Sequence, residues 1–404
     1  MARISKAYRT LWGLSGNPFP DHAIAAAGDH QQPFYEQLHP AVGPRMARAF
    51  LGANGAARQV AFLWSLGYGE EARGYGKTRH LLWFANRVNE DLGRQMLKLA
   101  GGDPEAERLL AAYAAFSTVD GISLSNLLFD VALHLARSLG QRLTELRAAM
   151  LAKGRTASEL YEHAAKRLMK SGESWDYWLL RSLSAEEPNA SVEYLESFGQ
   201  WHKVRFGREM LRSMVAFLNE VGVDRLVVLV DQVEDFASYN TPKYKLQRDF
   251  HRLALLCTSD KLLRNRITFV LTMHPRAAYI VSRHWSGPPV SPDDSAENVI
   301  ILKAITKRRF ASLVEAYLSS VRIQRSRDAL MPLSGDVIDL IHEQERGRPG
   351  HCLRRIFYLL ETAAAEGRKK IHKDIAHRCL AEGATLRPGL HICKAGTRSR
   401  NWTR

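Results

Sequence analysis

Five short apolar segments, each of a length suited to one β-strand, are spaced along the first three quarters of the chain. They cover residues 59–66, 111–119, 226–230, 266–272 and 298–302. The third is an unbroken aliphatic run, which is typical of a strand buried on both faces in a parallel sheet. The pattern therefore predicts an α/β fold built on a five-stranded parallel sheet.

The other segments show the helical spacing of apolar residues. Residues 126–200 read as a helical insertion between the second and third strands, and another helix is expected at about 208–221. After residue 303 we expect helices alone. The first carries the apolar stripe Phe310, Leu313, Val314, Tyr317 and Leu318, and the others cover about 336–346, 353–367 and 371–380. We therefore expect an N-terminal arm laid over the sheet (1–58), a core (59–303), a helical lid (304–382) and a basic tail (383–404).

A glycine-rich stretch, GYGEEARGYGKT at residues 67–78, follows the first strand and runs into a helical segment. This is the context of a phosphate-binding loop, in which backbone N–H groups cradle the phosphates. The lysine of such a loop reaches the outer phosphates, and the hydroxyl beside it holds Mg²⁺. Lys77 and Thr78 are the candidates for these two roles. The other candidate nucleotide-binding residues are Gly74, Tyr75, Gly76 and Arg79.

The loop departs from the usual spacing at one position, where Glu71 stands in place of the first glycine. A carboxylate aimed at a bound triphosphate would be repulsive. Either Glu71 points outward, or Gly69 provides the turn in a loop that is two residues longer. A glycine-rich turn that binds nothing is the third alternative, and the sequence leaves all three open.

Two polar residues lie at the ends of later strands. Asp231 follows the aliphatic run, so it would lie at the carboxyl edge of the sheet, where ligands of open α/β sheets bind. There it would hold the water shell of Mg²⁺ opposite Thr78. Alone, such an aspartate is more often a helix cap or turn residue, but the upstream glycine loop favours nucleotide binding. Thr272, at the end of the fourth strand, would orient the attacking water.

The net charge of +15 is concentrated near the C-terminus, because residues 301–404 hold 21 basic and 10 acidic residues. This excess favours a polyanionic partner, most often a nucleic acid. A basic surface that only keeps the chain soluble explains the charge equally well.

Cysteine usage and hydropathy limit the remaining possibilities. The four cysteines are scattered without a CxxC pair, which predicts a reducing cytoplasm and no structural zinc. No apolar run approaches the roughly 18 residues of a membrane span, and no secretory signal is visible at the N-terminus.

The glycine loop, the two later strand ends and the helical lid follow one another along the chain in an order that resembles an AAA+ ATPase. The resemblance covers about residues 11–380. Gly-Tyr-Gly-Lys-Thr at 74–78 looks like Walker A, Asp-Gln-Val-Glu-Asp at 231–235 looks like Walker B, and Thr272 looks like sensor 1. Gly-Arg-Pro-Gly-His-Cys-Leu-Arg-Arg at 347–355 is similar to the lid turn of the origin-recognition and initiator branch, and Gly-Asn-Pro-Phe at 16–19 is reminiscent of initiator-like and secretion-accessory members. The resemblance implies a P-loop NTPase core with ATP and Mg²⁺ as ligands. It also implies a sensor 2 arginine, Arg354 or Arg355, and an arginine finger, Arg276 or Arg283, with Arg283 the preferred candidate.

The sequence departs from this family in two respects. The residue after Asp231 is usually a glutamate that activates water, but here it is Gln232, whose amide cannot take a proton. Hydrolysis would be slow unless Glu234 substitutes, and the Asp-Gln-x-Glu sequence looks like that of STAND signalling NTPases. The chain also stops too soon to hold the winged helix that initiators carry after the lid.

We therefore expect an ATP-binding AAA+ protein that acts as a nucleotide-gated switch or loader on DNA, with slow hydrolysis. Replication, transposition and defence against mobile DNA are the candidate settings. A protein partner and an ATP-dependent homo-oligomer are also expected. The alternatives are a STAND-like signalling ATPase that activates an effector, and a degenerate nucleotide-binding scaffold.

Overall fold

The computed structural model describes residues 6–21, 41–52, 59–66, 73–115, 124–156, 159, 211–212, 214–233, 251–252, 263–273, 297–323 and 326–378. The chain forms two compact units. One comprises Ile24–Lys303, and the other joins Met1–Ala23 to Ala304–Arg404. We call them the sheet unit and the helical unit.

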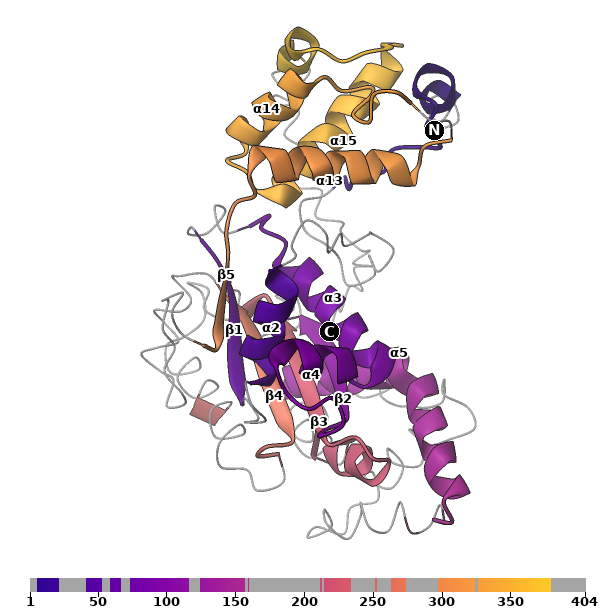
Figure 1. The fold of residues 1–404 in the computed structure, drawn as a ribbon, viewed down its shortest axis with the longest axis vertical. Helices are drawn as coiled ribbons and strands as arrows, with labels where there is room; N and C mark the ends of the chain where they lie inside the picture. Colours follow the sequence, from indigo (N-terminus) through magenta and orange to yellow (C-terminus); the bar gives the residue numbers. More distant parts are fainter. Residues whose placement is uncertain are drawn as a thin grey trace, which may run out of the picture. The chain divides into compact units, whose positions relative to one another are not determined.

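The sheet unit contains a five-stranded, all-parallel sheet, which confirms the predicted fold class (Figure 1). Its strands lie in the order β2-β3-β4-β1-β5, so β1 is flanked by the two strands that come last in the chain. Parallel neighbours require crossover connections, and α5 (Leu124–Ala152) lies in the one that joins β2 to β3. The strands are β1 (Val60–Ser65), β2 (Leu109–Ala115), β3 (Arg225–Asp231), β4 (Ile267–Met273) and β5 (Val299–Leu302).

One face of the sheet is covered by α2 (Val42–Leu51), α3 (Lys77–Asp91) and α4 (Arg94–Ala100), as Figure 1 shows. Their buried apolar residues form a single cluster with the side chains of all five strands that point to this face. Because side chains alternate along a strand, the same face carries Ala61, Leu63 and Ser65 of β1. It is the face on which the candidate site lies.

Helices α2 and α4 were not predicted. The first turn of α2 contains Gly43 and Pro44, which look like a turn in the sequence, although proline is well tolerated at the start of a helix. The short α4 lies between Gly93 and Gly101, both with positive φ. Helix α5 (Leu124–Ala152), at the start of the predicted helical insertion, is one continuous helix that Gly140 does not interrupt.

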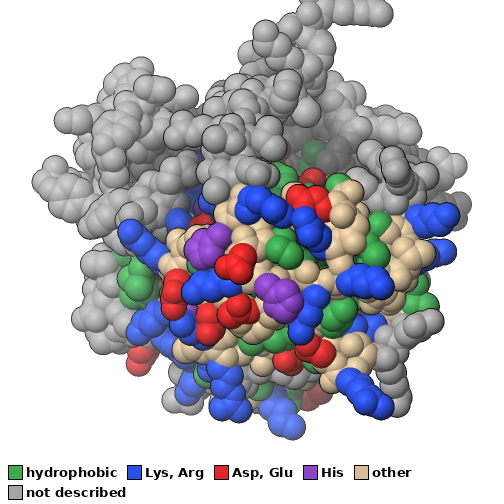
Figure 2. Space-filling view, turned by 90° about the horizontal axis from the view of Figure 1, so that it is seen from above, with side chains coloured by type: hydrophobic (Ala, Val, Ile, Leu, Met, Phe, Trp, Pro, Cys, Tyr) green, Lys and Arg blue, Asp and Glu red, His purple; other side chains and the backbone are tan. Residues whose placement is uncertain are grey.

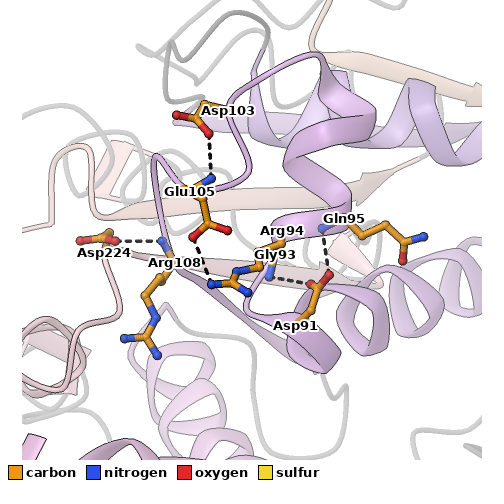
Figure 3. A network of polar contacts seen from close by, with 8 residues as sticks. All are labelled: Asp91, Gly93, Arg94, Gln95, Asp103, Glu105, Arg108 and Asp224. Atoms are coloured by element: carbon orange, nitrogen blue, oxygen red, sulfur yellow. Dashed lines mark hydrogen bonds and ion pairs between the residues drawn. The ribbon is translucent and has the colours of Figure 1, made fainter. Parts of the chain in front are cut away.

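Polar contacts at the amino edge of the sheet fix the alignment of β2 with β3 (Figure 3). Asp224 accepts a hydrogen bond from the Arg108 N–H at 2.8 Å, and its own N–H donates to the Arg108 carbonyl at 2.8 Å. Asp91 accepts from the N–H groups of Gly93 and Gln95 and so caps α4, while Arg94 pairs with Glu105. These contacts hold β2 in the register that sets Tyr113 opposite Leu229 and Ala115 opposite Asp231.

The helical unit is built on α13 (Lys307–Ser320), α14 (Gly335–Gln344) and α15 (Pro349–Ala365). Phe310, Leu313, Val314, Tyr317 and Leu318 are all buried, which confirms the predicted apolar stripe of α13. Thr306 caps this helix by accepting a hydrogen bond from the Arg309 N–H.

Residues 6–21 contact the helical unit, whereas we had expected the whole arm of residues 1–58 to lie over the sheet, as its later part, α2, does. Tyr8, in the π-helical turn η1 (Tyr8–Trp12), donates to Glu361 at 2.8 Å, and the Trp12 indole donates to the Arg368 carbonyl at 2.9 Å. Phe19 stacks on Tyr317 with ring centroids 5.4 Å apart. The aromatic residues that looked like cover for a sheet therefore cover helices.

Candidate functional site

The glycine loop leads directly into α3. Gly74 and Gly76 have φ values of 81° and 87°, a left-handed conformation that glycine adopts without strain. Gly76 is the N-cap of α3, with no side-chain cap and no acidic residue in the first turn. The N-terminus of this 15-residue helix therefore presents backbone N–H groups and the positive end of its dipole, which together suit an anion.

Lys77, the first residue of α3, is buried with 9% of its surface exposed. Its Nζ donates to the Ser65 hydroxyl at 3.1 Å, and Ser65 is the buried last residue of β1. The lysine is therefore held beside the strand end that precedes the glycine loop. Ser65 was not singled out in the sequence because it lies within an apolar run.

Asp231 lies at the end of β3 and is almost completely buried, at 1% exposure. Its Oδ2 accepts hydrogen bonds from the Thr78 hydroxyl and, at 3.1 Å, from the Tyr113 hydroxyl. Its Oδ1 accepts from the Thr272 hydroxyl at 2.7 Å and from the Gln232 N–H at 2.9 Å. The structure thus brings Thr78, Asp231 and Thr272, which were selected separately from the sequence, into one hydrogen-bonded group.

The order of the strands explains this convergence. β4 lies between β1 and β3, so the carboxyl ends of these three strands are neighbours. Three polar residues lie at these strand ends, on the face that α3 covers: Ser65, Thr272 and Asp231. The apolar cluster of this face ends where they begin. A buried polar row at this edge is the arrangement expected of a ligand site in an open α/β sheet.

Tyr113, on β2, is the additional site residue that the structure reveals. Burial, and then the negative charge of Asp231, raise the pKa of the Tyr113 hydroxyl far above its usual value, so it remains a hydrogen-bond donor. Neither glycine nor charge marks this position in the sequence. The register of β2 against β3 was the missing information.

Gln232 has a φ of 59°, a left-handed conformation that is uncommon for a residue with a side chain. Its N–H is directed to both Asp231 Oδ1 and the Thr272 hydroxyl, the latter at 3.0 Å. The backbone strain therefore lies next to the buried carboxylate, as is common at functional sites.

The remaining predicted residues fall into two groups. Glu71, Glu234, Arg276 and Arg283 lie outside the described residues. Arg354 and Arg355 belong to α15 of the helical unit, where the Arg354 guanidinium lies 5.5 Å from the centre of the Tyr358 ring. Arg355 donates to Glu345 at 2.7 Å, and the same buried glutamate pairs with Arg348 at 3.3 Å.

The chemistry of the donors fits Mg²⁺. Thr78 and Asp231 supply hard oxygen atoms in direct contact with each other, and Mg²⁺ is usually held by one or two such protein ligands together with waters and phosphates. No group of three or more His, Cys, Asp or Glu side chains suited to a metal occurs among the described residues.

No protein-family model matches the chain, and no curated protein matches it. Among solved structures it is similar to the Aeropyrum pernix ORC2 protein in its ADP form, with a TM-score of 0.46 and 13% identity over 86% of this chain and 68% of that one. It is also similar to the Aeropyrum pernix ORC1 protein in complex with DNA, with a TM-score of 0.42 and 12% identity over 90% and 68% of the two chains. Similarities at this level do not identify what the chain binds.

No helix among the described residues has the length and apolarity to cross a membrane.

Proposed function

We propose that the chain binds ATP with Mg²⁺ at the carboxyl edge of the sheet and acts as an AAA+ nucleotide-gated switch on DNA. The observation that carries the proposal is the hydrogen bond between Thr78 and Asp231, residues that are 153 positions apart. Lys77 lies at the start of the same helix, between a glycine loop and the end of β1. This proximity supports a magnesium–triphosphate site that both segments build.

Each residue of the site has a physical role in this proposal. The N–H groups after Gly74 and Gly76 bind phosphate oxygens, with Tyr75 and Arg79 flanking them, and Lys77 turns from Ser65 to the outer phosphates. Thr78 and Asp231 would hold Mg²⁺ with its waters, and the metal would supply positive charge that neutralises the outer phosphates. Thr272 orients the attacking water.

Slow hydrolysis follows from Gln232. The side-chain amide of Gln232 lacks a basic atom. The backbone N–H of Gln232 already donates hydrogen bonds to Asp231 and Thr272. Proton removal from water would then depend on Glu234. Arg354 or Arg355 as sensor 2, and Arg283 as the finger, complete the proposal. Arg355 must exchange Glu345 for phosphate to take that role.

DNA is the proposed partner because cations are concentrated in the helical unit. The loop after α15 exposes Arg368, Lys369, Lys370 and Lys373 within six residues. Glu366 pairs with Arg368 at 3.0 Å and with Arg378 at 3.2 Å, and the charge of Lys373 acts on Glu343, whereas the structure shows no ion pair between Lys369 or Lys370 and a described residue. On the face drawn in Figure 2, Lys and Arg side chains lie around and among the acidic and histidine side chains. This unbalanced charge suits a phosphate backbone.

The nucleotide proposal is tested by ATP hydrolysis and particle mass, measured with and without duplex DNA. Wild type should bind ATP, turn it over slowly and gain mass through self-association. Lys77→Ala should lose all three properties, while Asp231→Ala should lose turnover and self-association and bind ATP more weakly in Mg²⁺. Lys98→Ala, which removes an exposed lysine of α4, is the control and should behave as wild type. Absence of ATP binding in wild type would refute the proposal.

The DNA proposal is tested by the salt dependence of duplex binding. Each lost phosphate contact lowers the slope of log K against log salt by roughly 0.9, so Lys369→Gln with Lys370→Gln and Lys373→Gln should lower it by up to about 2.7. Arg94→Gln with Lys98→Gln and Lys153→Gln removes three exposed cations of the sheet unit as a control. Equal slopes for the two triple variants would remove this loop from the interface.

A second candidate, a STAND-like signalling switch, is favoured by Gln232 following Asp231. It predicts tight nucleotide binding and an ATP-dependent mass change that DNA does not alter. A degenerate scaffold, in contrast, would bind ATP without releasing phosphate and without any mass change.

A further inference from the structure

The inference concerns Tyr113, and it rests on the proposed nucleotide site. Tyr113 lies on β2 with 5% of its surface exposed, and its hydroxyl donates to Asp231 Oδ2 at 3.1 Å. The glycine loop, α3 and the ends of β3 and β4 account for the other parts of the site. Tyr113 comes from the edge strand, which contributes no other polar side chain to the carboxylate.

The register of the sheet makes this contact possible. Tyr113 is paired with Leu229, two residues before Asp231, so its side chain shares the face of Asp231 but starts one row lower. The position directly beside Asp231 is Ala115, whose side chain is small. A tyrosine in the lower row is long enough to pass the alanine and bring its hydroxyl to the carboxylate.

The donors to Asp231 differ in what metal binding requires of them. Thr78 donates its proton to Oδ2 in the structure, and as a Mg²⁺ ligand it would also offer a lone pair of the same oxygen to the cation. The position of the Thr78 hydroxyl would then depend on the metal as well as on Oδ2. Tyr113 is the other described donor to that oxygen, and Thr272 with the Gln232 N–H holds Oδ1.

We propose that Tyr113 is a positioning residue that keeps Oδ2 of Asp231 aimed at the metal while Thr78 serves as a metal ligand. The Tyr113 hydroxyl, which also lies beside the Thr78 hydroxyl, acts on the metal through Asp231. Outer-shell hydrogen bonds of this kind are worth about 10- to 100-fold in metal affinity. Tyr113 would therefore set the Mg²⁺ concentration at which the switch binds nucleotide tightly.

The test uses the full chain and a fluorescent ADP analogue, titrated in EDTA and across a Mg²⁺ series. Tyr113→Phe should raise the half-saturating Mg²⁺ concentration about 10-fold or more, because the ring remains and only the donor is lost. Affinity in EDTA should stay at the wild-type value. Unchanged Mg²⁺ dependence, or an equal loss of affinity in EDTA, would overturn the role.

A matched control is available in the helical unit. Tyr8 is also buried and donates its hydroxyl to a carboxylate, that of Glu361, at 2.8 Å. Tyr8→Phe removes the same chemical group and should leave the Mg²⁺ dependence unchanged, while thermal unfolding of both variants reports the cost to the fold. A Mg²⁺ shift of equal size in both variants would show a general effect on stability and overturn the proposal.

A double-mutant comparison tests whether Tyr113 acts through Asp231. In an Asp231→Asn background, Tyr113→Phe should cause no further change in Mg²⁺ dependence. A further 10-fold loss there would overturn the proposed route. If wild type binds no nucleotide, the proposed function and this inference both fail. If wild type binds and Tyr113→Phe matches it, the inference alone fails.

Discussion

The two edges of the central sheet both bury charged groups but balance them differently. At the amino edge, Arg225 of β3 is 2% exposed and pairs with Glu107 at 2.8 Å. At the carboxyl edge of the same strand, Asp231 is held by the Thr78, Tyr113 and Thr272 hydroxyls and a backbone N–H. One edge opposes charge with charge, and the other surrounds a carboxylate with neutral donors.

This difference suits the amino edge to stabilising the fold and the carboxyl edge to binding a cation. Burial lowers the pKa of Arg225, and the charge of Glu107 opposes that effect, so the cation is compensated within the protein. The described donors to Asp231 are neutral, and Lys77 at the same edge donates to Ser65 instead. A cation bound at Asp231 would therefore meet a carboxylate that no ion pair with a described residue compensates, whereas Arg225 at the amino edge already has Glu107.

The largest expected effect is at the amino edge. Glu107→Ala leaves the buried Arg225 without its carboxylate and should lower the free energy of unfolding by about 3 kcal/mol, measured by urea denaturation. Nucleotide affinity should not change. Glu105→Ala, which removes an exposed partner of Arg94, is the control and should cost less than about 0.5 kcal/mol. Equal costs would mean that Arg225 does not depend on Glu107.

The next effect is at the carboxyl edge. Asp231→Ala should weaken binding of nucleotide in Mg²⁺ by about 100-fold, or about 2.7 kcal/mol, and leave binding in EDTA nearly unchanged. The measurement is equilibrium titration with a fluorescent nucleotide. Asp224→Ala, at the other end of the same strand, should lower stability without altering the Mg²⁺ dependence. The reverse outcome would exchange the roles of the two edges.

Gly93 provides a smaller test of the amino edge. A Cβ at this position would lie 2.8 Å from the Leu109 side chain at the start of β2, and φ is +86°. Gly93→Ala should therefore cost about 2 kcal/mol in thermal or urea unfolding. Gly101 has φ +85° but no atom within 4 Å, so Gly101→Ala should cost about 1 kcal/mol from the backbone alone. Identical losses would show that the contact with Leu109 relaxes freely.

The smallest expected effect sharpens the contrast at Gln232. Gln232 has a φ of 59°, and Gln232→Gly removes the steric strain of a side chain in that conformation. The free energy of unfolding should rise by about 0.5 kcal/mol, because the greater conformational entropy of glycine in the unfolded chain offsets part of the gain. Asn265→Gly, at a φ of 63° outside the site, is the comparison. A loss of stability at Gln232 alone would indicate that its side chain makes a favourable contact.

The sheet could be predicted because strands buried in a parallel sheet are continuous apolar runs, as in β3. Lys77, Thr78, Asp231 and Thr272 were also visible, since each lies where such a run ends or where the following helix begins. These signals are local in the sequence, so the residues could be selected before their proximity was known.

Other features depend on contacts between distant segments. Tyr113 reaches Asp231 through the register of two strands, and nothing near Tyr113 in the sequence encodes that register. Phe19 and Trp12 look like core residues in any context, so their sequence could not distinguish a sheet from helices as the surface that they cover. The start of α2 was hidden because Gly43 and Pro44 resemble a turn.

The N-terminal residues pack in the same unit as residues 304–404, and this limits the order in which the chain can fold during synthesis. Tyr8 and Glu361, which are hydrogen-bonded, are 353 positions apart. At about 5 to 20 residues per second, a ribosome takes roughly 20 to 70 seconds to make the intervening polypeptide. During that interval the aromatic residues of the N-terminal segment lack the helices that they contact in the native structure. The sheet unit, whose sequence lies between the two parts of the helical unit, can therefore fold before the helical unit is complete.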